Sequence, residues 1–133
     1  MLLALFGVFL AYAFVTAAYK EDLRGTVIII DEVEAMLMPS TVRTVTGYTA
    51  REDETDDTPF TTADGTDLRT SKDQVCASNN YPFETILYID GLGLCTVHDR
   101  MAKKNNGKVD WHFQTVQEAK DWGVRTRKIT KVK

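Results

Sequence analysis

The sequence predicts a mainly β protein, a small closed barrel with one short helix, preceded by an N-terminal hydrophobic helix. Several short runs of strand-forming residues are separated by turn signals built on Gly, Asn and Asp, which is typical of compact all-β domains. One helix is marked by capping residues at both of its ends. An uncharged apolar run occupies the N-terminus. Together these three observations define the expected fold class.

The N-terminal run, residues 1–18, contains no charged side chain. A membrane-spanning helix needs roughly 20 apolar residues and at least about 17, so the run is long enough for a membrane anchor. It also fits a cleaved signal peptide, with small residues at Val15-Thr16-Ala17 before the cut. A buried core helix is the third alternative. The first two place the rest of the chain outside the cytoplasm, either anchored to the membrane or secreted into the cell envelope.

The remaining chain divides into a linker and one domain. Residues 19–40 are interpreted as a juxtamembrane linker, and residues 41–133 are expected to form the barrel. The net charge of -3 gives the chain no general attraction to nucleic acid. The basic side chains near the C-terminus alternate with Val124, Thr126 and Ile129, which is typical of a solvated strand face. We expect no nucleic-acid partner and a monomeric protein.

The expected strands of the domain are all short. Closure into a barrel is the arrangement that leaves no strand edge unpaired. The turn Gly91-Leu92-Gly93 separates two of the strands, and Asn105-Asn106-Gly107 is typical of a hairpin connection. The expected strands cover residues 41–50, 74–77, 84–90, 94–98, 108–113 and 124–132.

A single helix is expected before the last strand. Thr115 and Glu118 have the spacing of a capping box, in which the hydroxyl and the carboxylate accept hydrogen bonds from exposed backbone amides. Ala119 and Trp122 then share one face of the helix. Gly123 is placed to end it.

Cys76 and Cys95 both lie in strand-like runs. An even number of cysteines in an exported protein permits one disulfide. The sequence alone does not bring the two Cα atoms within bonding range. A disulfide and a pair of buried thiols therefore remain alternatives.

An acidic loop in the middle of the domain matches only the first ligands of a calcium-binding loop. Asp53, Thr55 and Asp57 stand at the first, third and fifth positions of such a loop. The glycine required at the sixth position is replaced by Thr58, and Pro59 follows. A solvated loop is the expected role. No His/Cys cluster with metal-ligand spacing is present in the sequence, and we predict no metal and no cofactor.

Asp99 and Asp110 are the candidate catalytic acids. Asp99 follows an apolar strand, and Asp110 stands inside the next expected strand, where an unpaired charge is costly. If neighbouring strands bring the two carboxyls together, their pKa values separate and one stays available as a proton donor near neutral pH. The alternative is structural, with Asp110 bound to backbone amides and Asp99 paired with Arg100. Alternation along a strand points His98 away from Asp99, and both His98 and His112 are expected to be non-catalytic.

Several short motifs occur in order between about residues 44 and 132. The two most specific ones contain the candidate acids, Val97-His98-Asp99-Arg100-Met101 and Gly107-Lys108-Val109-Asp110. The others are Gly47-Tyr48-Thr49-Ala50, Thr58-Pro59-Phe60, Thr62-Ala63-Asp64-Gly65, Val75-Cys76-Ala77-Ser78-Asn79, Tyr81-Pro82-Phe83-Glu84-Thr85, Gln117-Glu118-Ala119 and Trp122-Gly123. In this order they resemble the three-aspartate (3D) domain family.

The resemblance implies a six-stranded double-psi β-barrel, similar to the C-terminal barrel of membrane-bound lytic transglycosylase A and to RlpA-like barrels. It also implies cleavage of the β-1,4 bond between N-acetylmuramic acid and N-acetylglucosamine in peptidoglycan, with a 1,6-anhydro product. One carboxyl protonates the glycosidic oxygen and then accepts the proton of the attacking C6 hydroxyl. By the resemblance, Asp99 is this acid/base and Asp110 tunes or orients it.

Within the matched motifs, Asn79, Thr62, Tyr48 and Arg100 are implied to bind the substrate. The expected partners are the glycan strands of peptidoglycan, together with the membrane through residues 1–18.

Two positions depart from the family pattern. The family's first aspartate falls at Asn79 or its neighbour Ser78, and the glycine expected before Thr85 is Glu84. An asparagine still forms hydrogen bonds but supplies no charge. The alternative function is therefore a non-catalytic barrel that binds peptidoglycan or takes part in cell division.

Overall fold

The computed structural model describes residues 17–21, 27–31, 37–51 and 58–133. The chain forms two compact units, Met1–Met38 and Pro39–Lys133. In the first unit, β1 (Ala17–Glu21) pairs antiparallel with β2 (Val27–Asp31). The expected anchor or signal helix at residues 1–18 lies almost wholly outside the described residues. In the part of the chain that is described, no helix has the length and apolar character needed to cross a membrane.

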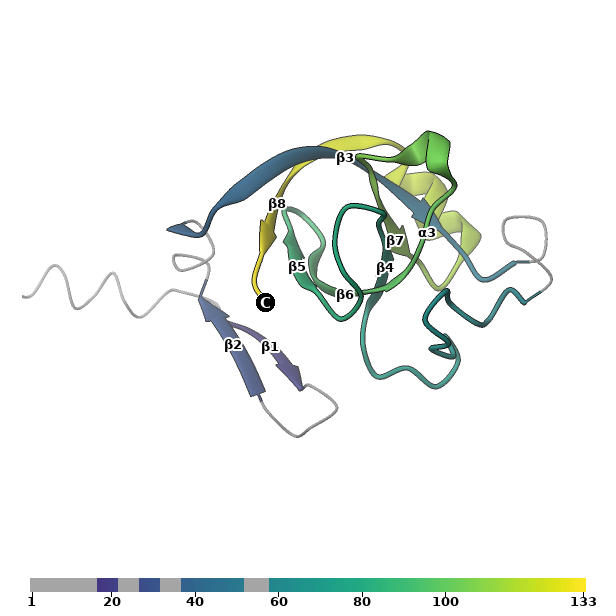
Figure 1. The fold of residues 1–133 in the computed structure, drawn as a ribbon, viewed down its shortest axis with the longest axis horizontal. Helices are drawn as coiled ribbons and strands as arrows, with labels where there is room; N and C mark the ends of the chain where they lie inside the picture. Colours follow the sequence, from purple (N-terminus) through teal and green to yellow (C-terminus); the bar gives the residue numbers. More distant parts are fainter. Residues whose placement is uncertain (1–16, 22–26, 32–36, 52–57) are drawn as a thin grey trace, which may run out of the picture. The chain divides into compact units, whose positions relative to one another are not determined.

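The second unit is a closed barrel of six strands with one α-helix, shown in Figure 1. The order around the barrel is β3-β7-β4-β6-β5-β8, and β8 closes it by pairing with β3. The predicted mainly β barrel is thereby confirmed, and each expected strand is present with its ends shifted by at most two residues. The strands are β3 (Ser40–Tyr48), β4 (Val75–Ala77), β5 (Ile86–Ile89), β6 (Gly93–Asp99), β7 (Val109–His112) and β8 (Arg125–Lys131).

Two strand pairs of the barrel are parallel, β3 with β7 and β4 with β6, and the other pairs are antiparallel. Parallel neighbours cannot be joined by a tight hairpin, so the chain must cross over the barrel between them. Because β4 and β6 run in the same direction, their carboxyl ends lie at the same end of the barrel. The candidate site lies at that end.

The helix α3 (Val116–Trp122) begins and ends where the sequence predicts. The Thr115 hydroxyl accepts from the amide of Glu118 at 3.2 Å, and the Glu118 carboxylate accepts from the Thr115 amide at 3.0 Å. Gly123 ends the helix with φ 65°. The indole Nε1 of Trp122 donates to the carbonyl of Val45 at 3.2 Å, which attaches the helix to β3.

The barrel interior is filled by apolar side chains and by one disulfide. Cys76 on β4 and Cys95 on β6 are bonded to each other, and neither is exposed to solvent. Of the two arrangements that the sequence left open, the structure has the bridged one. The other buried core side chains are Val45, Leu87, Ile89, Val97, Val109, Trp111, Trp122 and Ile129.

Candidate functional site

A pocket of about 460 Å³ opens at the carboxyl ends of β4 and β6, and the oppositely directed β3 also lines it. Each of these strands contributes its last residue to the lining, namely Tyr48, Ala77 and Asp99. Its volume lies within the range of roughly 300–1,000 Å³ that is typical of small-ligand sites. The remaining lining residues are Thr58, Pro59, Thr61, Thr62, Ala63, Arg100, Met101, Ala102, Asn105 and Asp110.

Asp99 and Asp110 both line this pocket, but they do not lie on adjacent strands. The prediction that neighbouring strands carry them was wrong, because β4 lies between β6 and β7. Ala77 pairs with Asp99 on one side and with Asp110 on the other. Since neighbouring strands are about 4.8 Å apart, the two aspartate backbones are separated by roughly 10 Å across Ala77. The small methyl side chain between them leaves the floor of the pocket open.

An irregularity in β6 brings Asp99 level with Ala77. Cys76 pairs with Val97, yet the next residue, Ala77, pairs with Asp99, so His98 is the extra residue of a β-bulge. In a regular ladder His98 would stand opposite Ala77. The bulge therefore replaces His98 by Asp99 at the rim of the pocket.

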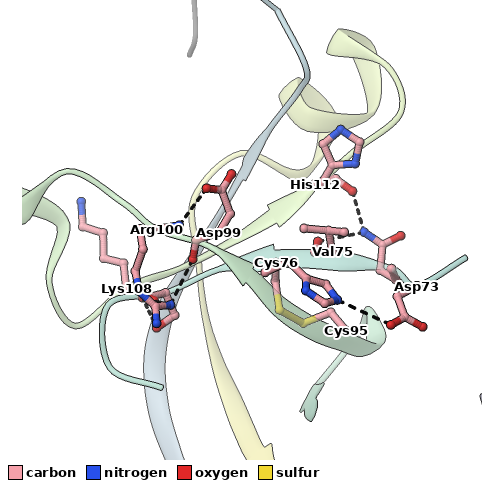
Figure 2. Close-up of a disulfide and its surroundings, with 11 residues drawn as sticks. Asp73, Val75, Cys76, Cys95, Asp99, Arg100, Lys108 and His112 are labelled. Carbon is pink, nitrogen blue, oxygen red and sulfur yellow. Dashed lines mark hydrogen bonds and ion pairs between the residues drawn. A yellow bond between two sulfur atoms is a disulfide. The ribbon is translucent and has the colours of Figure 1, made fainter. Parts of the chain in front are cut away.

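The two oxygens of the Asp99 carboxylate have different partners. Oδ1 accepts from the backbone amides of Ala63 at 3.0 Å and Arg100 at 2.8 Å. Among the described residues, Oδ2 accepts only from the Tyr48 hydroxyl, at 3.2 Å. Figure 2 shows Asp99 at one side of the Cys76–Cys95 disulfide, with its carboxylate turned away from the side chain of Arg100. Oδ2 is thus the oxygen that is left with the fewest protein donors.

Tyr48 serves as a hydroxyl donor to this carboxylate. Burial raises the pKa of Tyr48 well above its ordinary value, and the nearby charge of Asp99, its hydrogen bond and the charge of Asp110 raise it further. The hydroxyl therefore keeps its proton at physiological pH. Because the pKa of Tyr48 is raised by both Asp99 and Asp110, the two aspartates lie around the same side chain.

Asp110 is held by the neighbouring strand. Thr46 on β3 pairs with Asp110 on β7, and the Thr46 hydroxyl donates to Oδ1 of Asp110 at 3.0 Å. This bond comes from a neutral donor, and Asp110 is one of the residues that line the pocket.

Arg100 does not neutralise Asp99 in the described part of the chain. Its guanidinium donates to the carbonyls of Ser78 at 2.7 Å and Asp99 at 3.3 Å, and it stacks over the ring of Phe83 at 3.6 Å. Its contact with the Asp99 carboxylate is made by the backbone amide instead. The structural alternative, in which the Arg100 side chain pairs with Asp99, is not the arrangement found.

Of the other two residues implied to bind substrate, one lines the pocket and one does not. Thr62 lines it and donates through its hydroxyl to Asp64 at 2.8 Å. Asn79 lies outside the lining. Its amide donates to the Met101 carbonyl at 2.8 Å and accepts from the Met101 amide at 2.9 Å. Asn79 therefore fixes the segment that follows Asp99.

Neither histidine lines the pocket, but each supports a residue that does. The ring of His112 meets the ring of Tyr48 edge-on, with centroids 5.3 Å apart. Burial lowers the pKa of His112, and the charge of Asp99 opposes that shift. His98 lies between Asp64 and Asp73, two acids that the sequence reasoning did not consider as partners. In the sequence, Asp64-Gly65 indicates a turn, which is the one local feature related to the contact between Asp64 and His98.

The chain matches no model of a known protein family. A search of curated proteins also finds no relative. Within the described residues, no group of His, Cys, Asp and Glu side chains is arranged to hold a metal ion. The resemblance to 3D domains accordingly rests on the sequence motifs, and it enters the function as a proposal.

Proposed function

We propose that the barrel is a peptidoglycan lytic transglycosylase-like enzyme with Asp99 as its acid/base. The observation that carries the proposal is the pocket itself, in which the carboxylates of Asp99 and Asp110 flank the small side chain of Ala77. Enzymes that cleave glycosidic bonds generally use two carboxylates that line one pocket.

The topology supports the finer assignment to a double-psi barrel of the 3D family. The two parallel pairs, β3 with β7 and β4 with β6, are joined by crossovers within a closed six-stranded barrel. The motifs that resemble the family lie on the elements that line the pocket, with Tyr48 ending β3 and Asp99 ending β6.

In this proposal Asp99 performs two proton transfers. Its protonated Oδ2 gives a proton to the glycosidic oxygen, and the bond to the anomeric carbon of the muramic acid breaks. The C6 hydroxyl of the same sugar then attacks that carbon and returns its proton to Asp99, so that a 1,6-anhydro ring forms and no water is consumed. Tyr48 and the Ala63 amide orient the carboxylate. The negative charge of Asp110 stabilises the oxocarbenium-like transition state.

The disulfide supports a location outside the cytoplasm. Disulfides persist in oxidising compartments and are rare in the cytosol. The bond between Cys76 and Cys95 lies in the barrel core. An extracytoplasmic barrel, anchored or secreted through residues 1–18, has direct access to peptidoglycan.

The test is digestion of purified peptidoglycan sacculi by the full-length protein, with the products analysed by mass. The wild type is expected to release muropeptides that end in 1,6-anhydro-muramic acid. Asp99→Asn should reduce that release by about 100- to 10,000-fold, the usual contribution of an acid/base group. Asp90→Asn changes an exposed aspartate outside the pocket and is the matched control, with release equal to wild type.

A second outcome would select the alternative function. The family's first aspartate falls at Asn79 or Ser78, and neither residue lines the pocket. The amide of Asn79 bonds to Met101 instead, which favours a barrel that binds glycan without cleaving it. If the folded wild type releases nothing and still sediments with sacculi, the protein is a peptidoglycan-binding module. Hydrolysed, non-anhydro products would contradict the transglycosylase chemistry.

A further inference from the structure

We propose that His98 is a positioning residue that acts on Asp99 through the turn Thr62–Thr66. The proposal concerns the backbone donor Ala63, which lies in that turn and bonds to Oδ1 of Asp99. Its meaning for catalysis rests on the proposed function, but the contact itself does not.

The turn is a compact unit with its own hydrogen bonds. The backbone amide of Thr62 donates to the carbonyl of Thr66 at 2.9 Å, and that of Gly65 donates to Thr62 at 2.9 Å. Gly65 has φ 90°, a conformation that favours glycine. Oδ1 of Asp64 accepts from the hydroxyls of Thr62 and Thr66, both at 2.8 Å. These bonds hold the turn together as a unit, and Ala63 is part of that unit.

His98 attaches this body to β6. The Asp64 amide donates to the His98 carbonyl at 3.2 Å, and Oδ2 of Asp64 lies 2.6 Å from Nδ1 of the His98 ring. One residue earlier in the turn and one residue later in the strand, the Ala63 amide bonds to Asp99. The two dipeptides Ala63-Asp64 and His98-Asp99 thus face each other, and Nδ1 of His98 also lies 3.3 Å from the hydroxyl of Thr66 in the same turn.

A second acid fixes the other edge of the imidazole. Oδ2 of Asp73 lies 3.5 Å from Nε2 of His98. The side chains of His98, Asp64 and Asp73 are only 8, 16 and 9% exposed. A ring enclosed in this way has little freedom to turn, so Nδ1 stays directed at Asp64. In Figure 2, Asp73 and Asp99 lie at opposite sides of the disulfide. His98, Asp64 and Asp73 are not among the residues that line the pocket.

Two substitutions of His98 separate its two ring nitrogens. The side-chain amide nitrogen of asparagine occupies nearly the place of Nδ1, whereas that of glutamine reaches the place of Nε2. His98→Asn should keep the contact with Asp64, and His98→Gln should lose it. Because the proposal depends on the contact with Asp64, it predicts that the bond between the Ala63 amide and Asp99 is kept in His98→Asn and lost in His98→Gln.

The readout is the pH titration of two backbone amides in the isotope-labelled full-length protein, followed by NMR. The amides of Ala63 and Arg100 both bond to Oδ1 of Asp99, so in the wild type both should report the titration of that carboxyl. In His98→Gln the Ala63 amide should stop following it while Arg100 continues. Hydrogen exchange at Ala63 should become faster by on the order of tenfold, as expected for the loss of one hydrogen bond.

Controls separate positioning from a general loss of stability. Ile129→Val truncates a buried core residue of β8 that does not line the pocket, and it should leave the Ala63 titration unchanged. If His98→Gln does not fold, Asp64→Asn keeps an acceptor oxygen for the hydroxyls of Thr62 and Thr66 and alters the atom that faces Nδ1 of His98, so it should give the same loss at Ala63. An unchanged Ala63 titration in folded His98→Gln or Asp64→Asn, or equal loss in His98→Asn, overturns the proposal. Absence of glycan cleavage by the wild type contradicts the proposed function alone and leaves this result standing.

Discussion

The carboxylate of Asp99 combines a fixed oxygen with a more available one. In the part of the chain that the structure describes, two backbone amides hold Oδ1, whereas Oδ2 faces a single neutral donor, the Tyr48 hydroxyl. An acid/base group needs this combination, because the carboxylate must keep its orientation while one oxygen gains and loses a proton. The raised pKa of Tyr48 keeps that hydroxyl from competing as an acid.

At the residue scale, the sequence identifies Asp99 as a candidate acid, but it does not identify the groups that bond to its carboxylate. The end of an apolar strand is visible in a sequence, and so is the motif around it. The bulge at His98 is not visible, because an extra residue in one strand is defined only against the register of its neighbour. The substrate role of Asn79 is implied by the resemblance alone, and the sequence does not reveal that its amide bonds to Met101.

Glu84 carries a backbone conformation that suits glycine. Its φ is 65°, and in the described chain it is the only residue other than glycine with a positive φ. The left-handed conformation costs a residue with a Cβ about 1–2 kcal/mol, and the entropy of glycine offsets part of the gain from replacing it. Glu84→Gly should therefore raise the free energy of unfolding by up to about 1 kcal/mol, measured by urea denaturation. Glu84→Ala is the control, since it removes the charge and keeps the Cβ; an equal gain in both variants would attribute the effect to charge.

At the element scale, α3 was predicted from its capping residues, but its docking was not. The helix is attached to β3 by the Trp122–Val45 hydrogen bond. Gly47 on β3 gives room to the ring of Phe113, which would lie 2.5 Å from a Cβ at that position. Local signals define where a helix starts and ends, whereas the surface that receives it depends on residues far away in the sequence.

The disulfide joins the two strands that carry the floor and one acid of the pocket. Ala77 follows Cys76 on β4, and Asp99 ends the strand that contains Cys95. The bonded cysteines are 19 residues apart, and a closed loop of this size stabilises a fold by roughly 3 kcal/mol. Cys76→Ala/Cys95→Ala should lower the free energy of unfolding by about that amount in urea denaturation. Reductant should destabilise the wild type and leave the double variant unchanged; a reduced wild type that is as stable as the oxidised one would refute this role.

For the whole molecule, closure of the barrel was predictable and the strand order was not. Many short strands indicate a closed barrel, because closure leaves no strand edge unpaired. The insertion of β4 between β6 and β7 depends on two crossovers. It places Asp99 and Asp110 on strands that are not adjacent. They lie on either side of Ala77 rather than on directly paired strands, and in the proposed function a sugar lies between them.

The stability of the whole barrel should depend on pH through His112. Burial lowers the pKa of His112 from its ordinary value of 6.5, and the facing groups are Tyr48, which stays neutral, and Asp99, whose charge only opposes the shift. As the pH falls below about 6.5, the unfolded chain binds a proton that the folded protein does not, so stability is full above that pH and is lost below it, by at most about 1.4 kcal/mol per pH unit. Urea denaturation at pH 7.5 and 5.5 should therefore show a smaller loss for His112→Gln than for the wild type. Burial raises the pKa of Asp64, but the bonds to His98, Thr62 and Thr66 outweigh it and lower that pKa, so the stability that Asp64 contributes is full above about pH 3.8 and is lost only below it. Equal losses in both proteins would show that His112 is not the group that couples folding to pH.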